Sequence, residues 1–136
     1  SKQSMLLAKK IMLEIDIPGE VHVPGDPFWL HQAIANLLQN AIDFSPIQGT
    51  ISLATRTDGE MVQLIIEDNG SAIPPYALEK IFDKFYSLKR PDTDRKSTGL
   101  GLNLVQQVAL LHNGRIELSN RKPQGAKAVL SLPKNN

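Results

Sequence analysis

The chain has 136 residues, of which 41% are apolar, and its fifteen basic residues nearly balance its fourteen acidic ones. This composition fits one soluble domain with a sizeable core, and the balanced charge gives no overall field that would attract nucleic acid or an anionic membrane. The absence of cysteine excludes disulfides, thiolate metal sites and a cysteine nucleophile, and no apolar run reaches the roughly 20 residues that a membrane helix needs.

The first third of the chain predicts a strand followed by a long helix. Residues 10–17 alternate apolar and polar side chains and end at a Pro-Gly pair, which is typical of a half-buried strand, here at a sheet edge. Residues 21–25 add a short extended piece. A helix is expected from Asp26 to about Asp43, because aspartate caps a first turn well and the proline that follows it fits the first helical position.

Two stripes run along this predicted helix. One is apolar and is expected to face the core, and its members are Leu30, Ile34, Leu37, Leu38 and Ala41. The other is small and polar, with members Ala33, Asn36, Asn40 and Asp43. The second stripe is where a ligand could lie.

The rest of the chain predicts two hairpins and two further helices. The expected strands are 50–57, 61–67, 115–120 and 126–132, the first two being joined by an Asp-Gly turn. The expected helices are 76–85 and 99–112. Residues 87–98 contain a proline and many charged side chains without apolar periodicity, so they should form a loop.

Asn36 and Asn40 lie one helical turn apart in the middle of the long helix. Asparagine is a poor helix former, so such a pair, with its carbonyl oxygens pointing the same way, requires a reason. Magnesium accepts oxygen ligands and usually keeps waters and phosphate oxygens beside one or two protein ligands. The pair fits such a site, although two solvent-exposed amides would show the same pattern.

Asp68, Asn69 and Gly70 follow the strand predicted at 61–67. A carboxylate at a strand end can accept a hydrogen bond from the exocyclic amine of adenine, and a glycine lets the base approach the backbone. Guanine would place an acceptor against this carboxylate, so adenine selectivity is expected. The competing interpretation is an ordinary Asp-Asn-Gly turn.

Residues 99–101, Gly-Leu-Gly, open the last predicted helix. Free backbone N–H groups and the positive end of the helix dipole favour phosphate there, and the Thr98 hydroxyl could add a donor, although the glycines could also simply begin the helix. The loop 87–98 carries four basic and two acidic residues and could close over a triphosphate, as could any solvated surface loop of this composition. Phe82 and Phe85 are expected to anchor its near end in the core.

Four motifs, in this order and at these separations, resemble the N, G1, F and G2 boxes of sensor histidine kinases. They are Asn36-x-x-x-Asn40, Asp68-x-Gly70, Phe82-x-x-Phe85 and Gly99-x-Gly101. The resemblance extends to residues 125–133, which are similar to the family's final strand. Short segments at 42–46, 76–78 and 85–88 are similar to one particular member of the family.

The resemblance implies the Bergerat fold, an α+β two-layer sandwich with a mixed sheet of about five strands, about three helices on one face, and ATP bound beneath a lid at 87–98. It implies a single catalytic domain over 1–136, in which residues 1–9 are a linker. Asn36 and Asn40 would be the catalytic pair, with Asn40 binding Mg²⁺. The implied nucleotide contacts are Asn36, Asn40, Asp43, Asp68, Gly70, Ile73, Phe85, Thr98, Gly99, Leu100, Gly101 and Leu102.

Two positions depart from the pattern of the sensor kinases, and a third differs from the related ATPases. Asp43 stands where many members have Lys or Arg near phosphate, and Ala72 replaces the second glycine of the usual Asp-x-Gly-x-Gly turn, so weaker nucleotide binding is expected. Asn36 stands where related ATPases of the gyrase, chaperone and mismatch-repair type carry a glutamate as general base. An amide cannot take a proton from water at neutral pH, so ATP hydrolysis should be slow.

The family's phosphoacceptor histidine lies on a separate dimerisation domain, and His22, His31 and His112 are each expected to be structural. The implied partners are that dimerisation and phosphotransfer domain and, indirectly, a response regulator; no contact with nucleic acid or membrane is expected. The parent would be a homodimeric bacterial inner-membrane sensor with this domain in the cytoplasm. Two alternatives stay open: a superfamily ATPase, and a non-catalytic nucleotide-binding interaction module.

Overall fold

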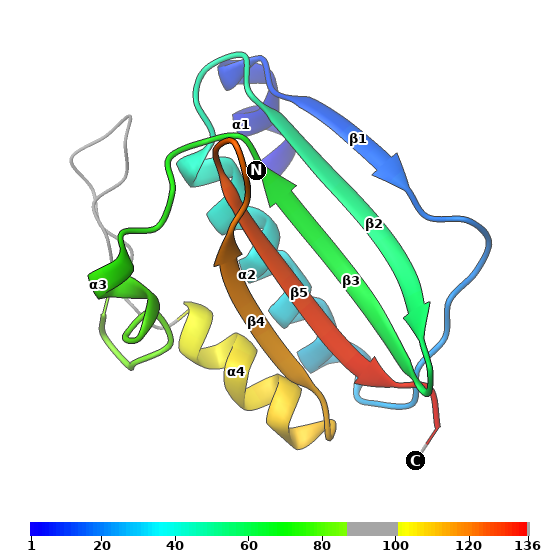
Figure 1. Cartoon of the computed structure of the whole chain (residues 1–136). Coiled ribbons are helices and arrows are strands. Elements are labelled where there is room, and N and C mark those ends of the chain that lie inside the picture. Colours follow the sequence, from blue (N-terminus) through cyan, green and yellow to red (C-terminus); the bar gives the residue numbers. More distant parts are fainter. Residues whose placement is uncertain (87–100, 136) are drawn as a thin grey trace.

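The computed structural model of the protein describes residues 1–86 and 101–135, whose arrangement is shown in Figure 1. Within these residues, five strands form one mixed sheet in the order β1-β2-β3-β5-β4. The strands are β1 (Met12–Asp16), β2 (Thr50–Asp58), β3 (Met61–Asp68), β4 (Arg115–Asn120) and β5 (Ala126–Pro133). β1 runs parallel to β2, and the other neighbouring strands are antiparallel.

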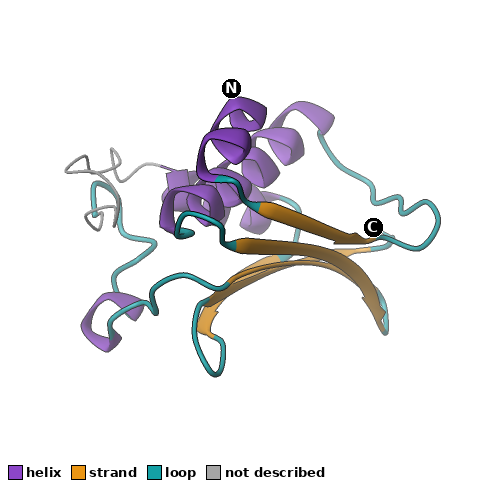
Figure 2. Ribbon diagram, turned by 90° about the horizontal axis from the view of Figure 1, so that it is seen from above, coloured by secondary structure: helices purple, strands orange, loops and turns teal. Residues whose placement is uncertain are grey.

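Four helices are described in the same residues. They are α1 (Lys2–Lys9), α2 (Pro27–Phe44), α3 (Pro75–Leu78) and α4 (Gly101–Leu111). Figure 2 shows the helices gathered on one face of the sheet, with the short α3 set apart from them. This two-layer α+β arrangement confirms the predicted fold class.

The core lies between the helices and the sheet. It is formed by Ala33, Leu37, Ala41 and Ile42 of α2, Val105, Val108 and Ala109 of α4, and Ile51, Ile66, Ile116, Ala128, Leu130 and Leu132 of the sheet. Removing such side chains from water is the main favourable term in folding, at roughly 1.5–3 kcal/mol for each large one. These buried side chains therefore hold α2 and α4 against the sheet.

The buried stripe of α2 differs from the predicted one. Ala33, predicted to face a ligand, is fully buried, whereas Ile34, predicted to face the core, keeps 38% of its surface exposed. The physical reason is that α2 packs against α4 as well as against β3, and a small alanine lets two helices approach closely. Ala33, Leu37 and Ala41 share the spacing of one helix face, so periodicity alone could not choose between the stripes.

β1 is the edge strand, as predicted, but it is not half-buried. All five of its residues are exposed, and Ile15 keeps 61% of its surface. The helices that cover the sheet pack over β3, β4 and β5. The alternating pattern therefore identified the strand correctly, while the burial that it implied was wrong.

The helix predicted at 76–85 is shorter in the structure. After α3, the chain continues in tight turns whose amides reach back three residues, and Asn103 of α4 donates to the Phe82 carbonyl at 3.1 Å. Phe82 packs against the core as predicted. Phe85 does not, because its backbone has a positive φ of 68° and its side chain keeps 70% exposure.

The first nine residues, predicted to be a linker, contain α1. Met5 and Leu6 pack against the core. The Lys9 ammonium donates to the carbonyl oxygens of Ile42, Asp43 and Ser45 at 3.0, 3.2 and 2.9 Å. A cation at this place satisfies carbonyls that the end of a helix leaves without an intrahelical partner, so α1 stabilises the last turn of α2.

Truncating Ile42, a fully buried side chain of α2, should destabilise the domain. Ile42→Ala is expected to lower the free energy of unfolding by about 2–5 kcal/mol, because it loses buried surface and leaves a cavity. Urea denaturation measures the change. The matched control Ile47→Ala removes a side chain that is 65% exposed and should change stability by less than about 0.5 kcal/mol; equal losses in the two variants would contradict the described core.

Candidate functional site

Asp68 ends β3 on the side of the sheet that faces the helices. Side chains alternate along a strand, so Asp68 shares its face with Ile66, which is 3% exposed. The aspartate itself is 5% exposed. The carboxylate of Asp68 therefore lies between the helices and the sheet. In an ordinary surface turn the same carboxylate would be exposed to water.

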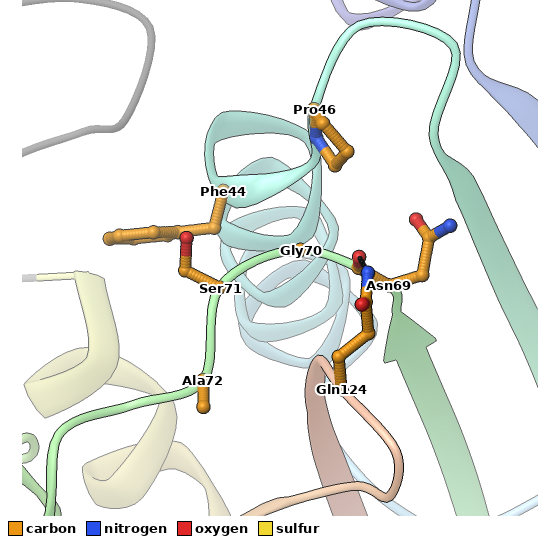
Figure 3. A pocket seen from close by; sticks show the side chains of 7 residues that line it. All are labelled: Phe44, Pro46, Asn69, Gly70, Ser71, Ala72 and Gln124. Carbon is orange, nitrogen blue, oxygen red and sulfur yellow. Dashed lines mark hydrogen bonds between the residues drawn. The ribbon is translucent and has the colours of Figure 1, made fainter.

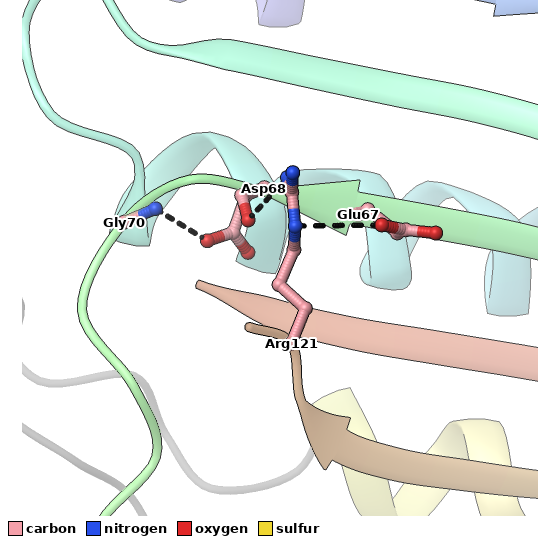
Figure 4. Close-up of polar contacts among 4 residues, drawn as sticks. All are labelled: Glu67, Asp68, Gly70 and Arg121. Carbon is pink, nitrogen blue, oxygen red and sulfur yellow. Dashed lines mark hydrogen bonds and ion pairs between the residues drawn. The ribbon is translucent and has the colours of Figure 1, made fainter. Parts of the chain in front are cut away.

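The environment of Asp68 explains how this charge is accommodated. Burial is the largest influence and raises its pKa above the ordinary value of 3.8, while the backbone N–H groups of Gly70 and Ala126 and the Arg121 guanidinium act in the opposite direction. The Gly70 N–H donates to Asp68 Oδ1 at 2.9 Å. Arg121 also contacts Glu67, with Nε and Oε2 3.5 Å apart, as Figure 4 shows. The carboxylate is thus held in place but keeps acceptor capacity for a ligand.

Gly70 packs directly against the end of α2. A side-chain carbon at this position would collide with the Phe44 carbonyl oxygen, so only glycine permits the approach. Ala72, which stands at the family's second glycine, is exposed and is not among the described residues with a positive φ. The structure therefore shows no backbone strain at the position where the sequence departs from the family.

A cavity of about 400 Å³ lies beside this turn. It is lined by Phe44, Pro46, Asn69, Gly70, Ser71, Ala72 and Gln124, and Figure 3 shows Phe44 and Ser71 close to one another at its wall. Asp68, Asn36 and Asn40 do not line this cavity, whereas Gly70, whose N–H donates to the Asp68 carboxylate, does. Phe44 was missed in the sequence analysis; an aromatic residue four positions after Asn40 was the available signal.

Asn36 of α2 and Gly101, the first residue of α4, lie together. A side-chain carbon on Gly101 would lie 2.9 Å from Asn36 Oδ1. The Asn36 amide nitrogen donates to the Gln32 carbonyl at 2.9 Å, which leaves Oδ1 on the side of α4. Asn40, one turn further along α2, is partly exposed. The structure therefore places Gly101, the second glycine of the Gly99-x-Gly101 motif, next to Asn36, the first asparagine of the predicted pair.

Asp43 lies where α1 meets the end of α2. The Gln39 amide donates to Asp43 Oδ1 at 2.9 Å and also approaches Met5 Sδ of α1 at 3.3 Å. Lys9 holds the backbone carbonyl of the same aspartate. These contacts give Asp43 a role in joining α1 to α2, and its predicted nucleotide contact stays a prediction.

The remaining predicted contacts are spread over the domain. Ile73 is partly exposed just beyond the Asp68 turn, Phe85 is exposed, and Leu102 packs against the core. Thr98, Gly99, Leu100 and the lid predicted at 87–98 lie outside the described residues.

His112 has the structural role that was expected of it. Its Nδ1 lies 2.8 Å from the Val108 carbonyl, and its Nε2 accepts from the Asp26 backbone N–H at 3.0 Å. The ring therefore ties the end of α4 to the start of α2. Within 1–86 and 101–135, no group of three or more His, Cys, Asp or Glu side chains could hold a metal ion.

Comparison with known proteins establishes the family. The profile of the histidine kinase-, DNA gyrase B- and HSP90-like ATPases matches residues 25–136. The chain belongs to this family. Its four motifs and its two-layer fold agree with that assignment, and the predicted resemblance is confirmed.

The curated relatives narrow the assignment to sensor kinases. Sensor protein CreC of Escherichia coli K12 is 49% identical over 127 residues, which are 93% of this chain and 26% of CreC. Sensor histidine kinase CusS of the same organism is 34% identical over 130 residues, which are 93% of this chain and 27% of CusS. CreC is the member to which segments 42–46, 76–78 and 85–88 are similar. The chain spans about a quarter of the length of these relatives.

Solved structures lead to the same type of domain. The nucleotide-free catalytic domain of histidine kinase ThkA superposes with a TM-score of 0.85 at 26% identity, covering 98% of this chain and 87% of that one. The mycobacterial sensor histidine kinase MprB gives 0.82 at 28% identity, covering 98% and 89%. The chain is therefore an ATP-binding catalytic domain of the sensor histidine kinase type. None of its described helices is long and apolar enough to cross a membrane.

Replacing Asp68 should change how stability depends on pH. Its pKa is raised in the folded chain above the 3.8 expected when unfolded, so its ionisation opposes folding. This effect is absent below the unfolded pKa, grows as pH rises from the unfolded pKa toward the folded pKa, and is constant above the folded pKa. The free energy of unfolding of the wild type, relative to Asp68→Asn, should therefore fall as pH rises across that window.

Urea denaturation at a series of pH values measures this difference. Asp58→Asn is the control, because it removes an exposed carboxylate at the end of β2 and keeps a side chain of nearly the same size. A difference between the wild type and Asp68→Asn that stays constant over the whole pH series would refute the buried charge.

Proposed function

We propose that this chain binds Mg-ATP and positions the γ-phosphate for transfer to a histidine on a separate dimerisation domain of a longer sensor kinase. The observation that carries the proposal is the arrangement along α2. Phe44 at its end contacts the turn of Asp68, and Asn36 lies beside the start of α4. Eight residues separate these two places, about 12 Å along a helix, which suits a nucleotide held by its base and its phosphates.

The base end has the groups that adenine requires. The Asp68 carboxylate is buried, is oriented by the Gly70 N–H, and retains lone pairs that can accept from an exocyclic amine. The Phe44 ring at the wall of the neighbouring cavity offers an aromatic face, and Ile73 offers an apolar one. A guanine base would present its carbonyl oxygen to the same carboxylate, which is unfavourable.

The phosphate end has the groups that a magnesium–triphosphate complex requires. Asn40 would supply one carbonyl oxygen to Mg²⁺, with the remaining ligands being water and phosphate oxygens. When bound, Mg²⁺ neutralises charge on the phosphates during transfer. Asn36 would provide a further polar contact, and the start of α4 would provide backbone N–H groups for phosphate.

The same residues favour transfer to histidine over hydrolysis. Asn36 cannot act as a general base toward water, because a neutral amide does not accept a proton at neutral pH. ATP would therefore stay intact until a stronger nucleophile arrives. That nucleophile, the dimerisation domain that carries it, a downstream response regulator and a homodimeric inner-membrane parent with this domain in the cytoplasm are all part of the proposal.

Calorimetric titration with a nonhydrolysable ATP analogue, with and without Mg²⁺, tests the two ends of the site separately. Asp68→Ala should weaken binding about ten- to a hundredfold and remove the preference for adenine over guanine, since a hydrogen bond to a charged group is lost. Asn40→Ala should remove most of the Mg²⁺ dependence while leaving base preference unchanged. Wild-type protein that binds no adenine nucleotide would support an interaction module instead.

Incubation with radiolabelled ATP tests the transfer reaction. The chain alone should not become stably labelled and should release phosphate slowly, whereas an added dimerisation domain with its histidine should become labelled. A histidine-to-alanine version of that domain is the control. Rapid multiple-turnover hydrolysis by the chain alone would instead favour a superfamily ATPase.

A further inference from the structure

The loop that joins β4 to β5 lies against the turn that carries Asp68. The segment 120–125, which consists of the last residue of β4 and the loop that follows it, is distant from this turn in the sequence, yet three of its side chains form hydrogen bonds with the backbone of residues 68–73. Side chains in an ordinary hairpin loop point into solvent and vary freely. Here they form a clamp, by which we mean Asn120, Arg121 and Gln124.

Asn120 makes the most complete of these contacts. The Ile73 N–H donates to Asn120 Oδ1 at 2.7 Å, and Asn120 Nδ2 donates to the Ile73 carbonyl at 2.9 Å. A single side chain thus supplies both bonds that a neighbouring strand residue would exchange with Ile73. Ile73 has no strand neighbour of its own in the sheet register, so this amide fixes the exit of the turn.

Arg121 and Gln124 hold the start of the same turn. Arg121 Nη1 donates to the Asp68 carbonyl at 3.1 Å, and Figure 4 shows its guanidinium between Asp68 and Glu67. Gln124 Nε2 donates to the Asn69 carbonyl at 2.7 Å, as Figure 3 shows. The contacts are directed at backbone carbonyls, so they fix the path of the turn and leave the Asp68 carboxylate available.

The backbone of the loop reinforces these contacts. A side-chain carbon on Gly125 would collide with the Asp68 carbonyl oxygen, so the two segments touch with nothing between them. Gly125 has a φ of 102°, which an L side chain rarely adopts. The loop is therefore built to lie against the turn.

From these contacts we infer that the clamp positions the Asp68 turn for adenine, and that Asn120 is a positioning residue on which the selectivity of the nucleotide site for adenine depends. The inference rests on the proposed function, since it concerns the same site. A hydrogen bond discriminates between bases only when its acceptor is held in place. Releasing Ile73 would let the turn and its carboxylate shift, so that adenine loses its bond while guanine, which makes no such bond, loses less.

Asn120→Ala tests the inference in the whole chain, with magnesium complexes of nonhydrolysable ATP and GTP analogues as probes. The ATP analogue should bind about tenfold more weakly, the size expected when hydrogen bonds that orient a binding group are lost. The affinity for the GTP analogue, measured by competition, should decrease less. The ratio of the affinity for the ATP analogue to that for the GTP analogue should therefore fall. The Mg²⁺ dependence should not change, because the clamp lies at the base end.

Two further variants separate positioning from general damage. Ser119→Ala alters the exposed neighbour on β4 and should leave affinity and preference unchanged. Asn120→Asp keeps the acceptor for the Ile73 N–H but sets an oxygen against the Ile73 carbonyl, so it should also narrow the preference. Urea denaturation should show that all three variants are folded.

The outcomes distinguish the inference from the function on which it rests. If the wild type binds neither analogue, the proposed function itself is overturned. If the wild type binds ATP analogue and Asn120→Ala binds both analogues as the wild type does, only the clamp is overturned. An equal loss for both analogues would show a purely structural role and would also overturn it.

Discussion

Burying the Asp68 carboxylate removes a charge from water, and the chain around it is arranged to offset that penalty. Two backbone N–H groups and a guanidinium face it, supplied by the turn itself and by the β4–β5 hairpin. None of them fully restores the lost hydration, because burial remains the dominant influence and raises the pKa. A charge held at such a cost is a frequent property of binding and catalytic sites.

The same constraint explains why separate segments converge on one end of α2. Gly70 must lack a side chain for the Asp68 turn to reach Phe44, and Gly125 must lack one for the hairpin to reach the turn. Lys9 also donates to the carbonyl oxygens at the end of α2. The site is therefore a junction of a helix end, a strand end and a hairpin, and each contributes backbone contacts that sequence motifs do not reveal.

The sequence allowed the strands and the long helix to be predicted, because each has a local signal: alternation, a characteristic turn, or a cap. Prediction failed where the outcome depends on packing between distant segments. Ala33 is buried because α4 lies against it, whereas Phe85, with a positive φ of 68°, is exposed where the chain leaves α3 in tight turns. Asn120 is an unremarkable hairpin residue in the sequence, and only the fold brings it to Ile73.

A crystal structure of the chain with Mg²⁺ and a nonhydrolysable ATP analogue would test the central claim most directly. The exocyclic amine of adenine should lie within hydrogen-bond distance of the Asp68 carboxylate, and the phosphates should extend along α2 toward Asn36 and Asn40. Density for the base at another place, with Asp68 contacting only protein, would contradict it.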